Sequence, residues 1–271
     1  MKNIDLKTVE SFGDEWLKFD QSGMEEDESI KLFNRYFSMF PWSKLPKNAK
    51  GFDMGCGSGR WAKFVAHKVR HLNCIDPSEA IKVAKKKLKK FKNITYHQES
   101  LDNISLKTES QDFGYSLGVL HHVPDTQEAI ISCSKLLKPG APLLLYIYYN
   151  FDNRPLWFKF LWSITNLLRL FIYRLPKFLK FLFCDIIAIL IYFPLAKISL
   201  ITEKVGIIFD NFPLYSYRHS SFYVMRTDAR DRFGTPLENR FSKKEIYKMM
   251  KKEELKKIKF SESVPFWTAI G

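Results

Sequence analysis

The chain has 271 residues, of which 46% are hydrophobic, enough to build one sizeable core and an elaboration on it. Its formal net charge of +14 makes an acidic surface or an anionic substrate worth considering as a partner. The lysine runs follow predicted helices and do not alternate with aromatic residues. This spacing is typical of solvated helix faces and argues against nucleic acid as the partner.

The cysteines and the N-terminus indicate a cytoplasmic protein. No Cys-x-x-Cys or mixed Cys/His spacing occurs, so we expect no metal site and buried thiols in a reducing compartment. Residues 1–10 are charged and lack the apolar run that a signal peptide needs. The four cysteines are Cys56, Cys74, Cys133 and Cys184.

Residues 1–49 form a helical lead-in. Apolar residues at three- and four-residue spacing predict a helix from Ser29 to about Phe40. Pro41 and Pro46 end it, because proline cannot continue a helix.

Residues 50–60 predict a strand end, a glycine-rich turn and a helix start. Gly55, Gly57 and Gly59 allow positive φ and leave no Cβ between the turn and a ligand. The helix predicted from about residue 60 would direct free N–H groups at that ligand, which favours an anionic or carboxylate-bearing cofactor. The spacing is Asp53-x-Gly-x-Gly-x-Gly, whereas a dinucleotide fingerprint would place its third glycine one residue later.

From residue 50 to about 150 strands and helices alternate, which predicts a parallel α/β sheet. The second strand ends at Asp76, about twenty residues past the turn, where a Rossmann-like fold places its ribose-binding carboxylate. Alternatively, Asp76 only caps the helix that Pro77-Ser78 opens. The further strands are predicted at 93–97, 112–120 and 143–149.

Capping signals mark two later helices. Asp125 and Glu128 have the spacing of a capping box, and so do Ser242 and Glu245. Two short strands are predicted after the second of these helices, at 255–260 and 264–270.

These features in this order resemble the class I S-adenosylmethionine-dependent methyltransferases, in particular the broad type 11 group that includes the quinone-biosynthesis C-methyltransferases. The Asp53–Gly59 turn and the stretch SLGVLHHVPD (116–125) carry the resemblance, which covers 50–150 and 242–271. It implies an α/β, Rossmann-like, doubly wound sheet that is mostly parallel and has an antiparallel C-terminal hairpin strand.

The resemblance also implies a site for S-adenosyl-L-methionine. Asp53 and the turn would hold the methionine part, Asp76 the ribose, and Ser100-Leu101 the adenine. The acid usual at the adenine step is replaced by Ser100, although Glu99 is an alternative carboxylate. The cofactor-binding residues so implied are Asp53, Gly55, Gly57, Gly59, Asp76, Pro77, Ser100, Leu101, Leu117 and Gly118.

By the same resemblance, His121 and His122 border the methyl-transfer site. One of them can act as a general base. Alternatively they only shape the site, because a sulfonium is a strong leaving group and in-line placement supplies much of the barrier reduction. N-terminal helices of the family often lie over the cofactor mouth, so the helix at 29–40 either does this or packs on a sheet edge.

Residues 151–241 exceed the usual connection at this point and are too apolar for disorder. An amphipathic helix is predicted over 156–175, and 178–196 is apolar nearly all round. Charges and a proline interrupt the second segment, which argues against a transmembrane span. The insertion is therefore a lid over an apolar substrate, a peripheral membrane contact through 156–196, or a hairpin packed on its own domain or in a dimer.

The charged stretch 226–238 is either a loop at the active-site mouth or a set of surface ion pairs.

The sequence thus predicts a helical lead-in (1–49), a cofactor-binding domain (50–150 and 242–271) and a helical, apolar and basic insertion (151–241). The predicted function is methyl transfer from S-adenosylmethionine to a small-molecule, glycan or lipid-like acceptor, in the cytoplasm or at the inner face of a membrane. Two alternatives remain: a non-catalytic membrane-associated protein that keeps the cofactor fold, and an NAD-dependent oxidoreductase. The glycine spacing and the C-terminal hairpin argue against the oxidoreductase, and the acceptor atom and the oligomeric state are not predicted.

Overall fold

The structure is a computed structural model that describes residues 2–207 and 211–271. The chain divides into two compact units. Unit 1 comprises Met1–Gln21, Ile30–Asn150 and Leu237–Gly271, and unit 2 comprises Ser22–Ser29 and Phe151–Pro236.

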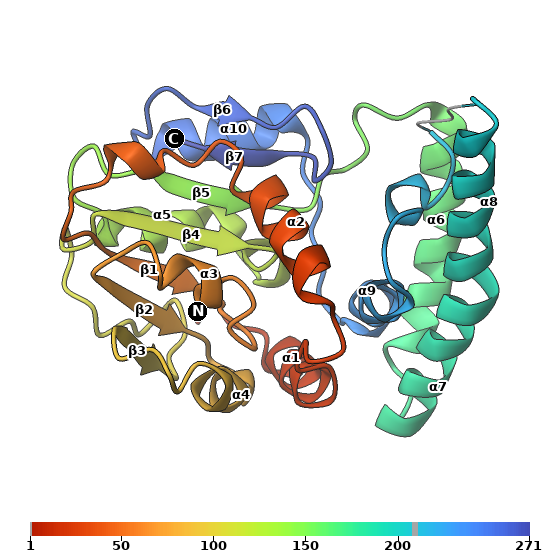
Figure 1. Cartoon of the computed structure of the whole chain (residues 1–271), viewed down its shortest axis with the longest axis horizontal. Helices are drawn as coiled ribbons and strands as arrows, with labels where there is room; N and C mark the ends of the chain where they lie inside the picture. The colour runs from red at the N-terminus through yellow and green to blue at the C-terminus, as the bar shows by residue number, and fades with distance from the viewer. Residues whose placement is uncertain (1, 208–210) are drawn as a thin grey trace. The chain divides into compact units, whose positions relative to one another are not determined.

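Unit 1 is built on a seven-stranded sheet with the order β3-β2-β1-β4-β5-β7-β6 (Figure 1). The first five strands pair in parallel, and β7 runs antiparallel between β5 and β6. The predicted Rossmann-like sheet with an antiparallel C-terminal hairpin is therefore confirmed. The strands are β1 (Lys50–Met54), β2 (His71–Ile75), β3 (Ile94–His97), β4 (Phe113–Leu117), β5 (Leu143–Tyr146), β6 (Lys259–Phe260) and β7 (Thr268–Ile270).

Helices cover both faces of this sheet, which is why its central strands are apolar throughout. One face packs against α2 (Glu26–Tyr36), α3 (Ala62–Val65) and α4 (Ala80–Lys87). The other face packs against α5 (Thr126–Leu136) and α10 (Lys243–Lys252) (Figure 1). A further helix, α1 (Leu6–Lys18), contacts α4.

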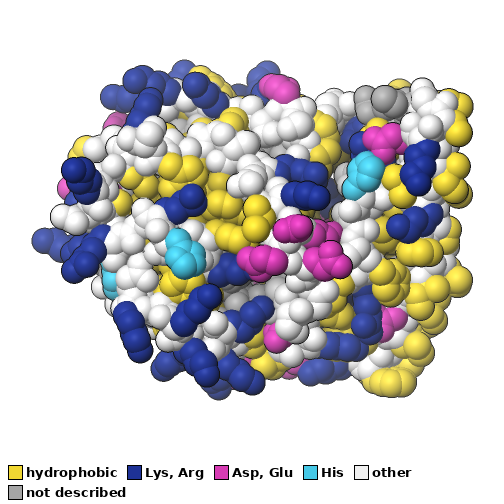
Figure 2. Space-filling view, viewed as in Figure 1, with side chains coloured by type: hydrophobic (Ala, Val, Ile, Leu, Met, Phe, Trp, Pro, Cys, Tyr) yellow, Lys and Arg dark blue, Asp and Glu magenta, His cyan; other side chains and the backbone are white. Residues whose placement is uncertain are grey.

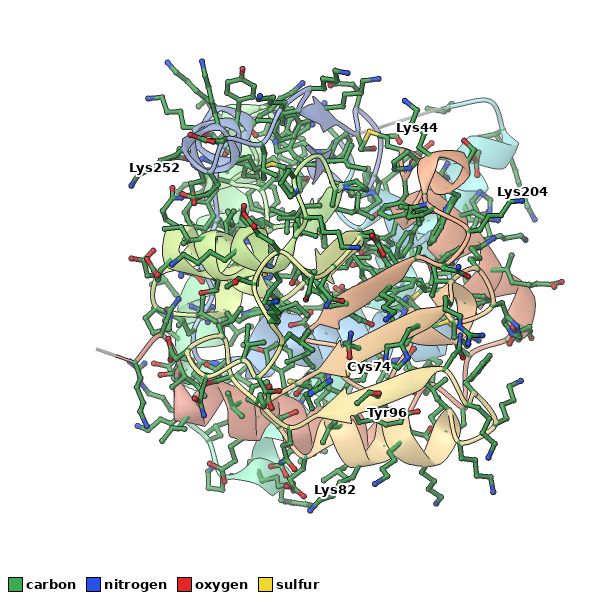
Figure 3. The ribbon with its side chains drawn as sticks, turned by 90° about the vertical axis from the view of Figure 1, so that its left-hand side faces the viewer. Lys44, Cys74, Lys82, Tyr96, Lys204 and Lys252 are labelled. Carbon is green, nitrogen blue, oxygen red and sulfur yellow. The ribbon has the colours of Figure 1, made fainter. Side chains whose placement is uncertain are left out.

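The cysteines and the lysine runs lie as expected. All four cysteines are buried, and none of them is in a disulfide. Cys74 is the register partner of Tyr96 on the neighbouring strand, and both are marked in Figure 3. Lys82 of α4 and Lys252 of α10 are exposed, as on a solvated helix face (Figure 3).

The caps are confirmed, and some boundaries differ from the prediction. The Asp125 side chain accepts a hydrogen bond from the Glu128 amide at 3.0 Å, and Ser242 and Glu245 form a capping box. The helix expected from about residue 60 begins only at Ala62 and has four residues, so it presents no substantial dipole to the turn. The helix expected over 29–40 is α2, and Phe37 continues its apolar face past its end.

Unit 2 is helical and has a core of its own. In it, α9 packs against α6, α7 and η3, and Ile172, Tyr192 and Phe233 are among the buried residues. The elements are α6 (Leu156–Ile172), α7 (Lys177–Ile187), the π-helix η3 (Ala188–Tyr192), α8 (Phe193–Lys204), the short η4 (Tyr215–Tyr217) and α9 (Phe222–Gly234).

Helices α7, η3 and α8 follow one another without a break from Lys177 to Lys204. The sequence predicts that Pro194 interrupts this segment, but the helix continues through it. The π-helix η3 lies where the Pro194 ring would otherwise meet the Leu190 carbonyl of a regular α-helix. By length and composition this 28-residue helix could cross a membrane, and it is the one such helix within the described residues. Core helices of soluble proteins pass the same test.

Candidate functional site

The turn after β1 is compact because its glycines meet neighbouring side chains. Gly57 has a φ of +52°, and a Cβ there would lie 3.1 Å from Nε1 of Trp16 on α1. Gly55 has a φ of +76°, and its Cβ would lie 2.5 Å from Val119, just past β4. Helix α1 therefore lies over the turn, a position that the sequence analysis had considered only for the later helix at 29–40.

Asp76 ties this turn to the end of β2. Its Oδ2 accepts a hydrogen bond from the Gly57 amide at 2.8 Å, and its Oδ1 accepts from the Ser78 amide and hydroxyl at 2.9 and 2.6 Å. Burial raises the pKa of Asp76, while the bonds from Ser78 and Gly57 oppose the rise. The N-cap residue of α4 is Glu79, so Asp76 does not cap this helix. Oδ1 already accepts two hydrogen bonds and Oδ2 one, so Oδ2 can accept one more, and the role in ribose binding stays a prediction.

Asp53 lies within β1, next to Tyr115 of β4. Its side chain is buried, and burial raises its pKa to about 8, with the Tyr115 hydroxyl lowering it and Asp76 adding to the rise. Within the described residues its Oδ2 has no hydrogen-bond partner. A buried carboxylate oxygen without a donor is costly, and a cationic amine would satisfy it. The amino group of a methionine-derived cofactor therefore fits this position.

The loop after β3 carries the residues expected at the adenine. Ser100 and Leu101 are half-buried, and Leu101 packs at the edge of the core that contains α5. Glu99, the alternative carboxylate, accepts a hydrogen bond from the Ser105 amide at 2.9 Å, so it is tied into its own loop. Pro77 is half-buried between Asp76 and Ser78.

The end of β4 faces aromatic residues. Leu117 ends the strand, and Gly118, with a φ of +79°, has the Tyr146 ring 3.9 Å from where its Cβ would be. The Tyr146 ring also meets that of Tyr36 at 5.2 Å. A side chain at Gly118 would therefore be in van der Waals contact with Tyr146 of this aromatic pair.

His121 is buried and neutral. Its ring stacks on Tyr148 at 3.7 Å, and its Nδ1 accepts a hydrogen bond from the Tyr148 amide at 3.3 Å. Burial, with the charges of His122 and Arg240, lowers its pKa well below the usual value. The ring proton therefore resides on Nε2, which has no hydrogen-bond partner among the described residues.

His122 lies beside His121 and contacts different elements. Its Nδ1 lies 2.7 Å from the Leu237 carbonyl oxygen, so Nδ1 carries a proton and donates it. The ring of Phe12 on α1 meets the His122 ring edge-on at 4.8 Å. Helix α1 thus reaches from the glycine turn to the residues that follow β4.

The segment that returns to unit 1 after the insertion completes this cluster. The Asn239 amide donates to the His121 carbonyl at 2.9 Å. Arg240 lies over the Tyr148 ring at 4.9 Å, and its Nε is 2.8 Å from Oε1 of the buried Glu238. Burial lowers the pKa of Arg240, but the Glu238 carboxylate more than offsets this, so the guanidinium stays charged.

Sequence reasoning missed Trp16, Tyr148 and Arg240. The aromatic alternation of Tyr146 and Tyr148 past a buried strand was a usable signal, because alternate residues share a face. Arg240 gave none, since it meets Tyr148 only through the fold.

Of the charged stretch 226–238, only Leu237 and Glu238 belong to unit 1. No group of three or more His, Cys, Asp or Glu side chains suited to a metal occurs in the part of the chain that the structure describes.

The comparisons with known proteins give a family and distant relatives. Residues 52–145 match the family model described as a methyltransferase domain. A ubiquinone biosynthesis O-methyltransferase of Xanthomonas oryzae pv. oryzae is 33% identical over 100 residues, which are 36% of this chain and 42% of that protein. The protein of the same name from Hahella chejuensis is 32% identical over 152 residues, 53% of this chain and 61% of that one. The chain therefore spans about two fifths of the length of the first of these relatives.

Among solved structures, the N-methyltransferase NodS from Bradyrhizobium japonicum, crystallised with S-adenosyl-L-homocysteine, is similar with a TM-score of 0.47. It is 21% identical, and the match covers 53% of this chain and 74% of that one.

Proposed function

We propose that this chain, which belongs to the class I S-adenosylmethionine-dependent methyltransferase family, transfers a methyl group from S-adenosyl-L-methionine to a small-molecule or lipid-like acceptor. When bound, the cofactor supplies a methyl group on a positively charged sulfur, which is a strong leaving group. The chain's own residues hold the cofactor and position the acceptor.

The observation that carries the proposal is the acid pair at the ends of β1 and β2. Asp53 has a buried oxygen without a donor, and it is suited to a cationic amine. Asp76 has both oxygens fixed by the turn and by Ser78, and its Oδ2 can accept one further hydrogen bond from a ribose hydroxyl group. S-adenosylmethionine carries one amine and one ribose diol. Asp53 and Asp76, the acids suited to these groups, lie beside the same glycine turn.

The acceptor side is the cluster of His121, His122, Tyr148 and Arg240. It is aromatic and carries one charged guanidinium, and a neutral imidazole is oriented by the Tyr148 amide. Because His121 and His122 are buried, the partly exposed Tyr148 and Arg240 would meet the acceptor, and they suit a flat or apolar one with an ionisable hydroxyl. The names of the curated relatives make a hydroxyl group of a ubiquinone precursor the first acceptor to test.

The test begins with the cofactor. S-adenosyl-L-homocysteine is titrated into the protein by calorimetry, alongside Asp53→Asn and a matched acid, Asp112→Asn, which lies at the amino end of β4 and pairs with Lys138. We expect Asp53→Asn to weaken binding about tenfold or more, as for the loss of a charge-assisted hydrogen bond. Equal affinity in all three proteins would contradict the assignment of Asp53.

The acceptor class is tested by transfer of a labelled methyl group into a cell extract that is then split into organic and aqueous phases. Label in the organic phase supports a lipid-like acceptor, and label in the aqueous phase supports a glycan or another small molecule. Cofactor binding with no labelled fraction would favour the non-catalytic alternative.

A further inference from the structure

Helix α6 buries Arg169 and, near its end, Ile172, and it turns most of its other apolar residues outward. Arg169 is buried, with Nε donating to the Asn166 side chain at 2.9 Å and Nη1 donating to the Thr235 carbonyl at 2.8 Å. On the opposite face Trp157 is 51% exposed and Phe160 is 69% exposed. The apolar stripe of this helix therefore does not face the core of unit 2.

The long helix from Lys177 to Lys204 is apolar on both its buried and its exposed face. Its buried row contains Cys184, Tyr192 and Ala196, which belong to the core that includes residues of α9. Its outward row is also apolar and is exposed along its whole length; Figure 2 shows hydrophobic side chains gathered along this edge of unit 2. The outward row includes Phe178, Leu182, Ile189, Leu190, Phe193 and Ile201. Water-soluble monomers rarely expose an apolar patch of this extent.

The polar contacts along α9 decide against a helix that crosses a bilayer. Arg226 donates two hydrogen bonds of 2.6 Å to the Asp185 carboxylate on α7, and the Tyr192 hydroxyl donates to Asp228 at 3.1 Å. A crossing would carry these charges on α9 into hydrocarbon, which is expensive. Only the outward face is free to meet lipid.

Charge indicates which surface the outward face meets. Helices α6 to α8 contain two acids, Asp185 and Glu203, and each is paired within unit 2, with Arg226 and Arg218. Arg169 is buried, and the other basic residues of the segment from α6 to α8 are Lys159, Arg174 (between α6 and α7), Lys177, Lys180, Lys197 and Lys204. A second copy of the chain would place like charges against each other, whereas anionic lipid headgroups complement them.

We propose that the outward face of α6 and of Lys177–Lys204 is a monotopic docking surface for an anionic lipid bilayer, with both helices lying in the plane of the interface. The apolar rows enter the boundary between headgroups and acyl chains, and the flanking lysines contact the headgroups. The inward rows keep their contacts with α9. Among the roles open to the insertion, this is the peripheral membrane contact.

The test is flotation of the full chain with vesicles of mixed phosphatidylcholine and phosphatidylglycerol, and with vesicles of phosphatidylcholine alone. We expect binding to the mixed vesicles that weakens with salt, and much weaker binding to the neutral ones. Phe160→Glu and Leu190→Glu should each lower the partition coefficient about tenfold or more. Leu6→Glu is the matched control, because Leu6 is an equally exposed apolar residue on α1 of unit 1.

A second pair of variants tests the electrostatic part. Lys177→Gln and Lys180→Gln together should lower binding to the anionic vesicles by about fivefold per lysine, without an effect on neutral vesicles. Circular dichroism of each variant confirms that the helices remain.

Three outcomes would overturn the proposal. The first is equal flotation of Phe160→Glu and of wild type. The second is resistance of the membrane-bound chain to alkaline carbonate extraction, which would indicate a spanning helix. The third is a lipid-free dimer that Phe160→Glu dissociates and that does not float, which would assign the face to a second copy. Because none of these assays involves the cofactor, their failure is separate from a failure of the proposed methyl transfer.

Discussion

The Asp76 carboxylate accepts the amide hydrogen bond of Gly57 at 2.8 Å, which joins the turn after β1 to the end of β2. The shape of the glycine turn therefore depends on an acid 19 residues away in sequence, whose other oxygen accepts hydrogen bonds from Ser78. An amide at this position keeps one acceptor oxygen and puts a donor where the other was.

Asp76→Asn should therefore destabilise the fold and the site together. Because one of the two acceptor oxygens becomes a donor that faces another donor, we expect a loss of about 1–3 kcal/mol in the free energy of unfolding. Urea denaturation measures this loss, and titration of S-adenosyl-L-homocysteine measures the accompanying fall in affinity. Unchanged stability would show that the turn holds its shape without the Asp76 contact.

Gly57→Ala tests the close approach of α1 to the turn. Its φ of +52° strains any other residue by about 1–2 kcal/mol, and its Cβ would meet Trp16. Gly140→Ala is the matched control, since its φ is +80° and a Cβ there meets nothing within 4 Å. Gly57→Ala should lose at least as much stability as Gly140→Ala, because it adds the close contact with Trp16, and only Gly57→Ala should lose cofactor affinity. Equal cofactor affinities of the Gly57→Ala and Gly140→Ala variants would show that the cofactor does not bind at this turn.

Asp53 gives the stability of the free protein a pH dependence of known sign. Its folded-state pKa of about 8 is above its unfolded value, so between about pH 4 and 8 the folded state holds more protons. Stability therefore falls as pH rises through this window, by at most about 1.4 kcal/mol per pH unit. Asp53→Asn should remove this slope in thermal melts at a series of pH values. A slope that persists in the variant would belong to another group.

His121 contributes the opposite slope. Its folded-state pKa lies well below its unfolded value, so its contribution is complete above about pH 6.5 and is lost as the pH falls below it. His121→Asn keeps an acceptor for the Tyr148 amide and cannot titrate, so it should reduce the fall in stability between about pH 6.5 and 5. Melts of Asp53→Asn and His121→Asn over the same pH series separate the two contributions.

Glu238 and Arg240 form a buried ion pair that holds the return segment against Tyr148. Glu238→Gln should destabilise the protein by about 3–5 kcal/mol, because it leaves a buried guanidinium without its carboxylate. The double variant Glu238→Gln, Arg240→Met should recover much of that loss. A double-mutant cycle by urea denaturation measures the coupling, and purely additive losses would mean that the pair is not coupled.

The sequence predicted the parts of unit 1 that are local. Alternation of apolar strands and helices placed the sheet, and the Ser242 and Asp125 caps placed two helix starts within a residue. The glycine spacing placed the turn, and the acid after β2 came to lie against it. These signals work because capping, turn geometry and strand burial each depend on a few neighbouring residues.

What the sequence could not supply depends on contacts across the chain. The lead-in helix α1 carries no motif, and only the fold brings Trp16 to Gly57 and Phe12 to His122. The stripe on α6 showed which residues share a face but not what covers that face, because periodicity is the same whether the apolar side meets a core or lipid. Pro194 was misjudged because a π-turn is not visible in a pattern of residue types.

The pairing of β5 with β7 has a consequence for how the chain folds. Leu144 and its partner Ile270 are 126 positions apart, and nearly all of unit 2 lies between them. Contacts of such separation form slowly, whereas the helices of unit 2 meet through nearer neighbours. During synthesis the apolar helices should therefore be assembled while the sheet still lacks its antiparallel strand, and aggregation should be greatest in that interval. Lipid or mild detergent supplied during refolding should raise the yield even where the final stability is unchanged.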